Sequence, residues 1–176
     1  MRAISPVLAV LVMAMLSHSA NCDDPVKRSA ELQVLDRFVG TWDLFVTAKP
    51  RDGQTATKKT SETRRWSLGG KFVQFENPQT ENPDEPHFHM LVTYDPATKT
   101  YPGVMMSGAG RSLVTGTWDQ TNNTMTFNGK SLEDGGTFVF KHRFIDADHG
   151  ESSGVLMNAK GEISLEVTQK QTRRGK

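Results

Sequence analysis

Among the residues that could do chemistry, one histidine stands out by its spacing. Phe138, Phe140, His142 and Phe144 occupy every second position, and two basic residues alternate with them. In a β-strand such residues share one face, and a phenylalanine face predicts that His142 points inward. A polar group there needs a hydrogen-bond partner. His142 is therefore a candidate to hold the polar end of a ligand or to coordinate a haem iron. The remaining alternative is a core histidine bonded to a neighbouring hydroxyl or carbonyl.

A second candidate is an arginine on an earlier segment. Glu62, Arg64 and Trp66 lie on one side of an expected strand, so both charges are buried if Trp66 is. Buried charges must be paired, and such a pair could anchor the carboxylate of a ligand. Alternatively, a bulge near Gly69 would turn Arg64 to solvent and Arg65 inward.

The sequence gives weaker support for a metal site or for nucleophilic catalysis. His87 and His89 share one face of an expected strand, but a metal site needs a third ligand. The opposite face carries Phe88 and Met90 and is the better core face, so the pair is expected to point outward and no metal site is predicted. Cys22 is the single cysteine, and no Gly-x-Ser-x-Gly motif occurs. Nucleophilic catalysis therefore has no visible candidate.

The elements that must position these residues are mostly strands. After residue 40, apolar residues alternate with polar ones and are interrupted by turn sequences, which predicts about ten short strands. Their short connections favour an all-β fold, an antiparallel up-and-down β-barrel. One helix is expected before them, beginning at Asp24-Pro25 and ending at Gly40. The Pro-rich segment 76–86 is expected to be a loop at the rim of a binding site, and the basic segment 170–176 a frayed tail.

Several short motifs resemble a known family. Gly40 lets the chain turn from helix to strand, and Trp42 is suited to fill the closed end of a barrel. The segment 38–42 resembles the barrel entrance of the calycins, which include lipocalins. Segments 66–73 and 94–101 resemble an exported bacterial family, domain of unknown function 1579. The resemblance implies a lipocalin-like barrel with the helix near one end, and it implies no particular activity.

The first residues read as a targeting segment. Arg2, the apolar run 7–16 and the small residues after it predict a signal peptide over residues 1–22, followed by a single barrel domain over residues 23–176. Export to the periplasm or the extracellular space is therefore expected. Acylation of Cys22, as in lipoproteins, is the alternative. No later stretch is long enough to span a membrane as a helix.

Charge and composition limit the classes of function that fit this sequence. Lys and Arg number 21 against 20 Asp and Glu, a net charge of +1, which argues against a nucleic-acid partner. We expect a non-enzymatic barrel that binds a small apolar or amphipathic molecule without a cofactor. An enzymatic or haem-binding barrel using His142 is an alternative, and so is a filled barrel that acts through its surface. The expected ligand-binding residues are His142, Phe138, Phe140, Phe144 and Arg64, and the expected structural residues are Gly40 and Trp42.

Overall fold

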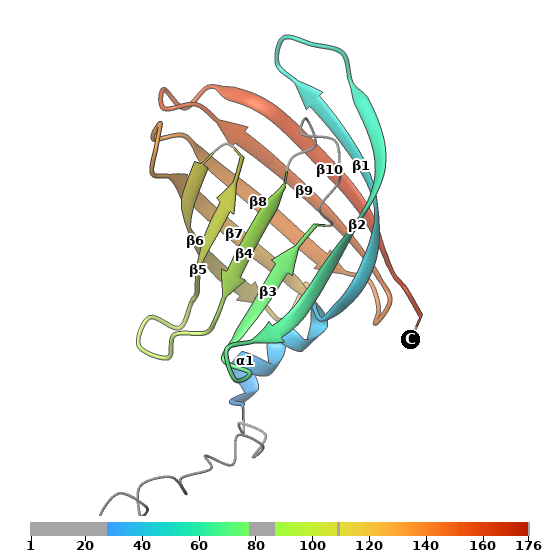
Figure 1. Ribbon diagram of the computed structural model, residues 1–176, viewed down its shortest axis with the longest axis vertical. Helices are drawn as coiled ribbons and strands as arrows, with labels where there is room; N and C mark the ends of the chain where they lie inside the picture. The colour runs from blue at the N-terminus through green and yellow to red at the C-terminus, as the bar shows by residue number, and fades with distance from the viewer. Residues whose placement is uncertain (1–27, 78–86, 109, 176) are drawn as a thin grey trace, which may run out of the picture.

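The protein is a closed ten-stranded antiparallel β-barrel. The computed structural model describes residues 28–77, 87–108 and 110–175 (Figure 1). Each strand pairs with its neighbours in sequence, and β1 closes the barrel against β10, so the expected up-and-down topology is confirmed. The strands are β1 Gly40–Pro50, β2 Ala56–Ser67, β3 Phe72–Glu76, β4 Phe88–Val92, β5 Tyr101–Ser107, β6 Gly110–Asp119, β7 Thr124–Ser131, β8 Thr137–Phe144, β9 His149–Met157 and β10 Ile163–Arg173.

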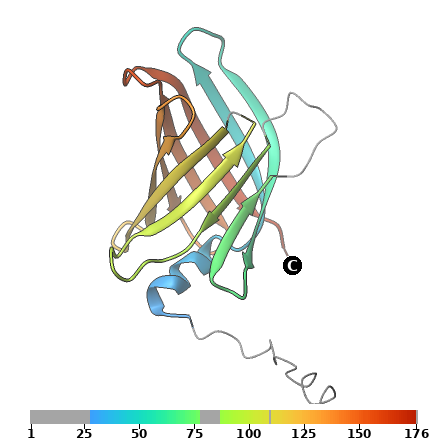
Figure 2. The same ribbon diagram turned by 60° about the vertical axis from the view of Figure 1, so that its left-hand side comes forward.

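A short helical segment lies across one end of the barrel (Figures 1 and 2). The α-helix α1 covers Ala30–Gln33 and the 3₁₀-helix η1 covers Val34–Arg37. The Ser29 hydroxyl accepts a hydrogen bond from the Leu32 N–H, so Ser29 is the N-cap, and the helix begins later than the sequence pattern predicted. Asp24 and Pro25 lie outside the described residues.

The helical segment is fixed to the barrel by aromatic side chains that donate hydrogen bonds to it. The Trp42 indole N–H donates to the Phe38 carbonyl at 2.7 Å, and that of Trp66 donates to the Asp36 carboxylate at 2.8 Å. The Tyr101 hydroxyl donates to the Glu31 carbonyl at 2.9 Å. Trp42 is 0% exposed, which confirms its expected place at the closed end beside Phe38. We call residues 30–38 the plug.

The chain turns from the plug into β1 at Gly40. Its φ of +136° is a backbone conformation that residues with a Cβ rarely adopt. The side chain of Arg173 covers the same turn and donates hydrogen bonds to the carbonyls of Val39 and Arg37. The junction predicted at Gly40 and Trp42 is therefore confirmed.

The last strand is longer than the sequence suggested. Residues 170–173 belong to β10 and pair with β1, and Arg174 forms an ion pair with Asp43 at 2.7 Å. The expectation of a frayed tail from residue 170 is wrong over these residues. The alternation of inward side chains continues through Gln169 and Gln171, and pairing with β1 is what closes the barrel.

Candidate ligand-binding site

The interior of the barrel has a tightly packed half and a more open half. Next to the plug, large side chains such as Phe75 and Phe127 are almost completely buried. Farther from the plug, inward-facing apolar side chains pack against this core but keep part of their surface exposed. Inward side chains are exposed only where solvent reaches them, so this half is open to solvent at the end away from the plug, and we call its interior the lumen. Its half-buried apolar side chains are Val46, Phe88, Met105, Phe140 and Leu156.

Two glycines hold aromatic rings against the wall of the lumen. Phe138 on β8 pairs with Gly129 on β7, and Phe140 pairs with Gly154 on β9. A Cβ at either glycine would overlap the ring of its partner. Each ring therefore lies over the backbone of the neighbouring strand instead of extending across the barrel. Glycine at these positions keeps the lumen wider than an aromatic-lined barrel otherwise allows.

A buried cluster of charged and polar side chains lies at the plug end of the lumen. Arg64 is 1% exposed, and its Nε donates to the Glu62 carboxylate at 2.7 Å. Its Nη2 donates to the side-chain oxygen of Gln171 at 2.8 Å, whereas Nη1 is buried and has no hydrogen-bond partner among the described residues. Three rings surround the guanidinium, with centroids 5.6, 5.2 and 5.4 Å from its Cζ: Phe38, Trp42 and Phe75. Their faces partly compensate the missing partner through cation–π attraction.

His142 lies between this cluster and the lumen. Its Nδ1 is 2.7 Å from the Ser152 hydroxyl and 3.3 Å from the side-chain nitrogen of Gln171. Desolvation in this enclosed position, together with the nearby Arg64 charge, lowers the pKa of His142 to about 3. The imidazole is therefore neutral at physiological pH, and part of the ring remains exposed to the lumen.

Ser152 and His142 are the residue types of a catalytic serine–histidine pair, but their environment does not suit nucleophilic catalysis. A general base works best with a pKa near the working pH, and that of His142 is about 3. The Ser152 hydroxyl also accepts a hydrogen bond from Gln171, which withdraws a lone pair from any attack on a substrate. The arrangement suits binding and orientation better than nucleophilic catalysis.

The structure brings most of the expected residues together. His142, Phe138 and Phe140 face the interior, and Phe140 stacks on His142 with ring centroids 6.5 Å apart. Phe144 faces inward too, but it is buried against the plug, with its ring centroid 4.8 Å from that of Phe38. Arg64 lies inside, as the side-chain alternation predicted. Contact of these residues with a ligand remains a prediction.

The alternatives for the neighbouring charges are resolved by the strand register. Arg65 is exposed and forms an ion pair with Glu76 at 3.0 Å, so no bulge reverses the faces of β2. His89 lies 3.9 Å from the same carboxylate, outside the barrel, as expected. Within the described part of the chain, no three His, Cys, Asp or Glu side chains are grouped to hold a metal ion.

Sequence reasoning missed two members of the cluster, Ser152 and Gln171. Both are buried, and both complete the hydrogen bonds between Arg64 and His142. The available signal was register: Ser152 lies directly opposite His142 on the next strand. A serine or glutamine in an alternating segment looks like a solvent-facing residue unless its face is assigned first.

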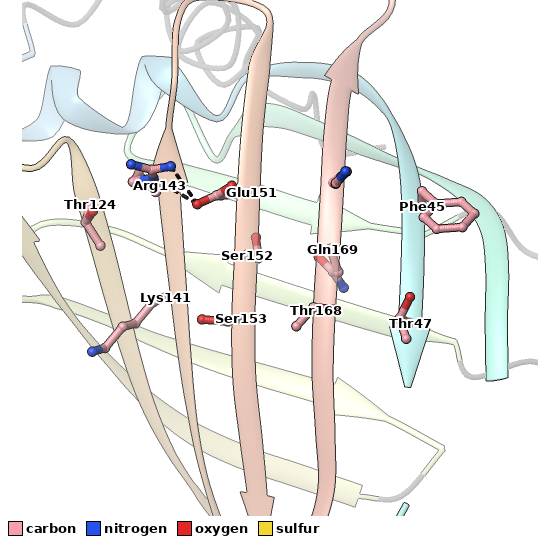
Figure 3. A pocket seen from close by; sticks show the side chains of 11 residues that line it. Phe45, Thr47, Thr124, Lys141, Arg143, Glu151, Ser152, Ser153, Thr168 and Gln169 are labelled. Carbon is pink, nitrogen blue, oxygen red and sulfur yellow. Dashed lines mark hydrogen bonds and ion pairs between the residues drawn. The ribbon is translucent and has the colours of Figure 1, made fainter. Parts of the chain in front are cut away.

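A separate hollow of about 460 Å³ lies on the outer wall of the barrel (Figure 3). Outward side chains of β8, β9, β10 and β1 line most of it, among them Lys141, Thr168 and Phe45. Arg143 and Glu151 form an ion pair at 2.8 Å on the same surface. None of the predicted ligand-binding residues borders this hollow, so we place the candidate site inside the barrel.

Fold and site together define a lipocalin-like barrel that is plugged at one end and has a polar cluster below an apolar lumen. The chain belongs to the family described as "Protein of unknown function (DUF1579)", whose sequence model matches residues 27–173. The resemblance seen in the sequence motifs is thereby confirmed. No curated protein matches the chain.

Solved structures share the fold at low sequence identity. Rv2717c from M. tuberculosis aligns with a TM-score of 0.63 at 12% identity, covering 84% of this chain and 99% of that one. The S-type phycobiliprotein lyase CPES from Guillardia theta gives 0.59 at 11% identity, covering 85% and 95%. A DUF3598 protein of unknown function from Nostoc punctiforme gives 0.56 at 12% identity; the match covers 80% of this chain but about half, 48%, of that one.

The described residues include no helix long and apolar enough to cross a membrane. For the described residues this agrees with the sequence analysis. Residues 1–22, where a signal peptide is expected, and the greater part of the Pro-rich loop, residues 78–86, lie outside the described residues.

Proposed function

We propose that this protein is an exported barrel that binds a small apolar or amphipathic molecule in its lumen. The observation that carries the proposal is the set of inward-facing apolar side chains that remain part-exposed, such as Phe140 and Leu156. Burying such surface in a ligand is favourable by roughly 25 cal/mol per Å². The glycines that seat Phe138 and Phe140 support the proposal, because they preserve interior space.

The comparisons add support at the level of the fold. One of the similar barrels is the S-type phycobiliprotein lyase CPES from Guillardia theta. At 11% identity this likeness extends to architecture, and the chemical nature of the ligand has to come from this chain's own residues.

The test is titration with the neutral lipophilic probe N-phenyl-1-naphthylamine, followed by fluorescence. We expect saturable binding by the wild-type protein and loss of binding by Leu156→Trp, because the indole fills the lumen. Ser153→Trp is the matched control, since Ser153 lies three positions earlier on the same strand, points outward and is exposed. Probe uptake by neither wild type nor control would overturn the proposal and favour the filled barrel that acts through its surface.

Native mass spectrometry of protein purified from its own cell compartment tests export and natural occupancy together. Export predicts a mature N-terminus near residue 22, and ligand binding predicts an added mass that is released on denaturation. An intact Met1 in the recovered protein would contradict export, and a lipid attached to Cys22 would identify a lipoprotein.

Haem coordination by His142 is tested in the same preparation by titration with haemin. An iron ligand needs a free lone pair on Nε2, and the hydrogen bonds at Nδ1 place the ring proton on Nε2 instead. We therefore expect no Soret shift that depends on His142. A shift that disappears in His142→Phe would establish the haem alternative.

A further inference from the structure

The hydrogen bonds at the plug end of the lumen follow a single donor-to-acceptor order, which starts at Arg64. A guanidinium only donates, so the Gln171 side-chain atom 2.8 Å from Nη2 must be its oxygen. The amide nitrogen of Gln171 then necessarily faces the other way, toward Ser152 and His142. Arg64 itself is held by Glu62, so the amide cannot turn over without losing a charge-assisted hydrogen bond.

The same logic fixes the proton on His142. The Gln171 amide nitrogen donates to the Ser152 oxygen, and the hydroxyl proton is left to donate to His142 Nδ1 at 2.7 Å. Nδ1 therefore accepts hydrogen bonds from both Ser152 and Gln171. A neutral imidazole that accepts at Nδ1 carries its proton on Nε2.

With Nδ1 engaged by Ser152 and Gln171, Nε2 is the ring atom of His142 that is left for a ligand in the interior. Among the described residues nothing accepts a hydrogen bond from Nε2, and unlike Arg64 Nη1 it is not enclosed. Its other neighbours are the rings of Phe38, Phe127 and Phe140, with centroids 5.7, 5.7 and 6.5 Å away. An N–H donor thus stands without a partner at the bottom of an apolar space.

We propose that the lumen selects apolar molecules whose inner end is a hydrogen-bond acceptor, a carbonyl or carboxylate oxygen, which His142 Nε2–H binds. This inference rests on the proposed function and names its ligand class. Arg64, Gln171 and Ser152 are positioning residues that keep the donor turned toward the ligand. A ligand ending in an ammonium group places a donor against a donor and binds more weakly.

The proton position is measured directly by ¹⁵N NMR of the wild-type protein labelled at histidine, with His142 assigned from the His142→Phe spectrum. We expect a neutral ring protonated at Nε2 at pH 7. Protonation at Nδ1 overturns the proposal whatever the protein binds.

The ligand class is measured by displacement of N-phenyl-1-naphthylamine with three compounds of equal chain length. We expect 2-dodecanone and dodecanoate to compete at concentrations about fivefold or more below that of dodecylamine, the advantage of one made hydrogen bond over an unmade one. The ketone and the carboxylate distinguish neutral from charged acceptors. In His142→Phe the ketone should lose its advantage while the probe still binds.

The outcomes separate this inference from the function on which it rests. If the probe does not bind, the proposed function fails. If the probe binds and all three compounds compete equally, the function stands and the ligand class is wrong. Equal affinities in wild type and His142→Phe for the ketone overturn the role of His142 in the same way.

The variant Gln171→Glu tests the chain of hydrogen bonds that runs from Arg64 through Gln171 and Ser152 to His142. A carboxylate at this position accepts from Arg64 and also from Ser152, so the Ser152 oxygen becomes the acceptor for a proton on His142 Nδ1. We expect Nδ1 to become protonated in this variant and to remain unprotonated in Gln169→Glu, where the inward-facing residue two positions earlier on β10 is changed. An unchanged Nδ1 in a folded Gln171→Glu protein contradicts the chain.

Discussion

At the scale of single residues, Arg64 is the less exposed of the two buried charged residues in the described part of the chain. It combines a charge, 1% exposure and an unpaired Nη1, and its partner Glu62 is 6% exposed. A buried ion pair stabilises little in total, because desolvation of both charges offsets their attraction. Removing one member is costly, because the other charge stays buried without compensation.

We therefore expect Arg64→Met to lower the free energy of unfolding by about 3–5 kcal/mol, measured by urea denaturation. The matched control is Arg65→Met, which removes an exposed ion pair with Glu76 and should cost less than about 1 kcal/mol. The double variant Arg64→Met, Glu62→Leu should recover most of the loss. Equal losses from Arg64→Met and Arg65→Met would show that the buried pair has no special role.

His142 makes stability depend on pH in a defined window. Its pKa is about 3 in the folded protein and about 6.5 in the unfolded chain, so the unfolded state binds more protons between these values. The contribution of His142 to the free energy of unfolding is fully present above pH 6.5. As the pH drops below this value, the free energy of unfolding falls by about 1.4 kcal/mol per pH unit. Urea denaturation between pH 7 and pH 4.5 should show this slope.

The control for the pH effect is His142→Asn, which does not titrate. Surface carboxylates such as Asp43 and Asp119 have pKa values lowered below 3.8 by hydrogen bonds, so they contribute only at still lower pH. Glu31 and Glu133, whose pKa values are lowered from 4.5 by hydrogen bonds, begin to contribute below about pH 5.5. The slope between pH 6.5 and about 5.5 should therefore be absent in the variant. A slope that persists unchanged would assign the titration to another group.

At the scale of elements, the plug and the barrel end depend on each other. The plug contains one turn of α-helix and one of 3₁₀-helix, too little to be stable alone. Its carbonyls and the Asp36 carboxylate receive hydrogen bonds from the barrel, and its Leu35 and Phe38 fill the barrel end. The plug therefore forms only as part of the barrel.

Trp42→Ala tests this dependence. The change removes a fully buried ring together with the hydrogen bond to Phe38, and we expect it to cost about 3–5 kcal/mol of unfolding free energy. Phe45→Ala on the same strand is the control, because Phe45 points outward and is 44% exposed. Thermal denaturation midpoints that fall equally in both variants would contradict the role given to Trp42.

At the scale of the whole molecule, the alternation of side chains along the strands predicted more of the barrel interior than the types of single residues did. The period of two placed Phe138, His142 and Arg64 inside, because every strand of a barrel presents one face to the interior. The cap of α1 at Ser29 was missed because Asp24-Pro25 also carries N-cap chemistry, and the sequence alone does not rank the two positions. Gln171 was missed because its role depends on Arg64, 107 positions away along the chain.

Under the proposed function, the plug would also determine how a bound molecule is exchanged. With one end of the barrel covered, entry and release use the same opening, and a polar end that reaches His142 must travel first and deepest. It sheds its hydration shell along an apolar passage before any hydrogen bond replaces the lost water. A carboxylate would then exchange more slowly than a ketone of equal length and equal affinity, so residence time, rather than equilibrium occupancy, would distinguish the natural ligand.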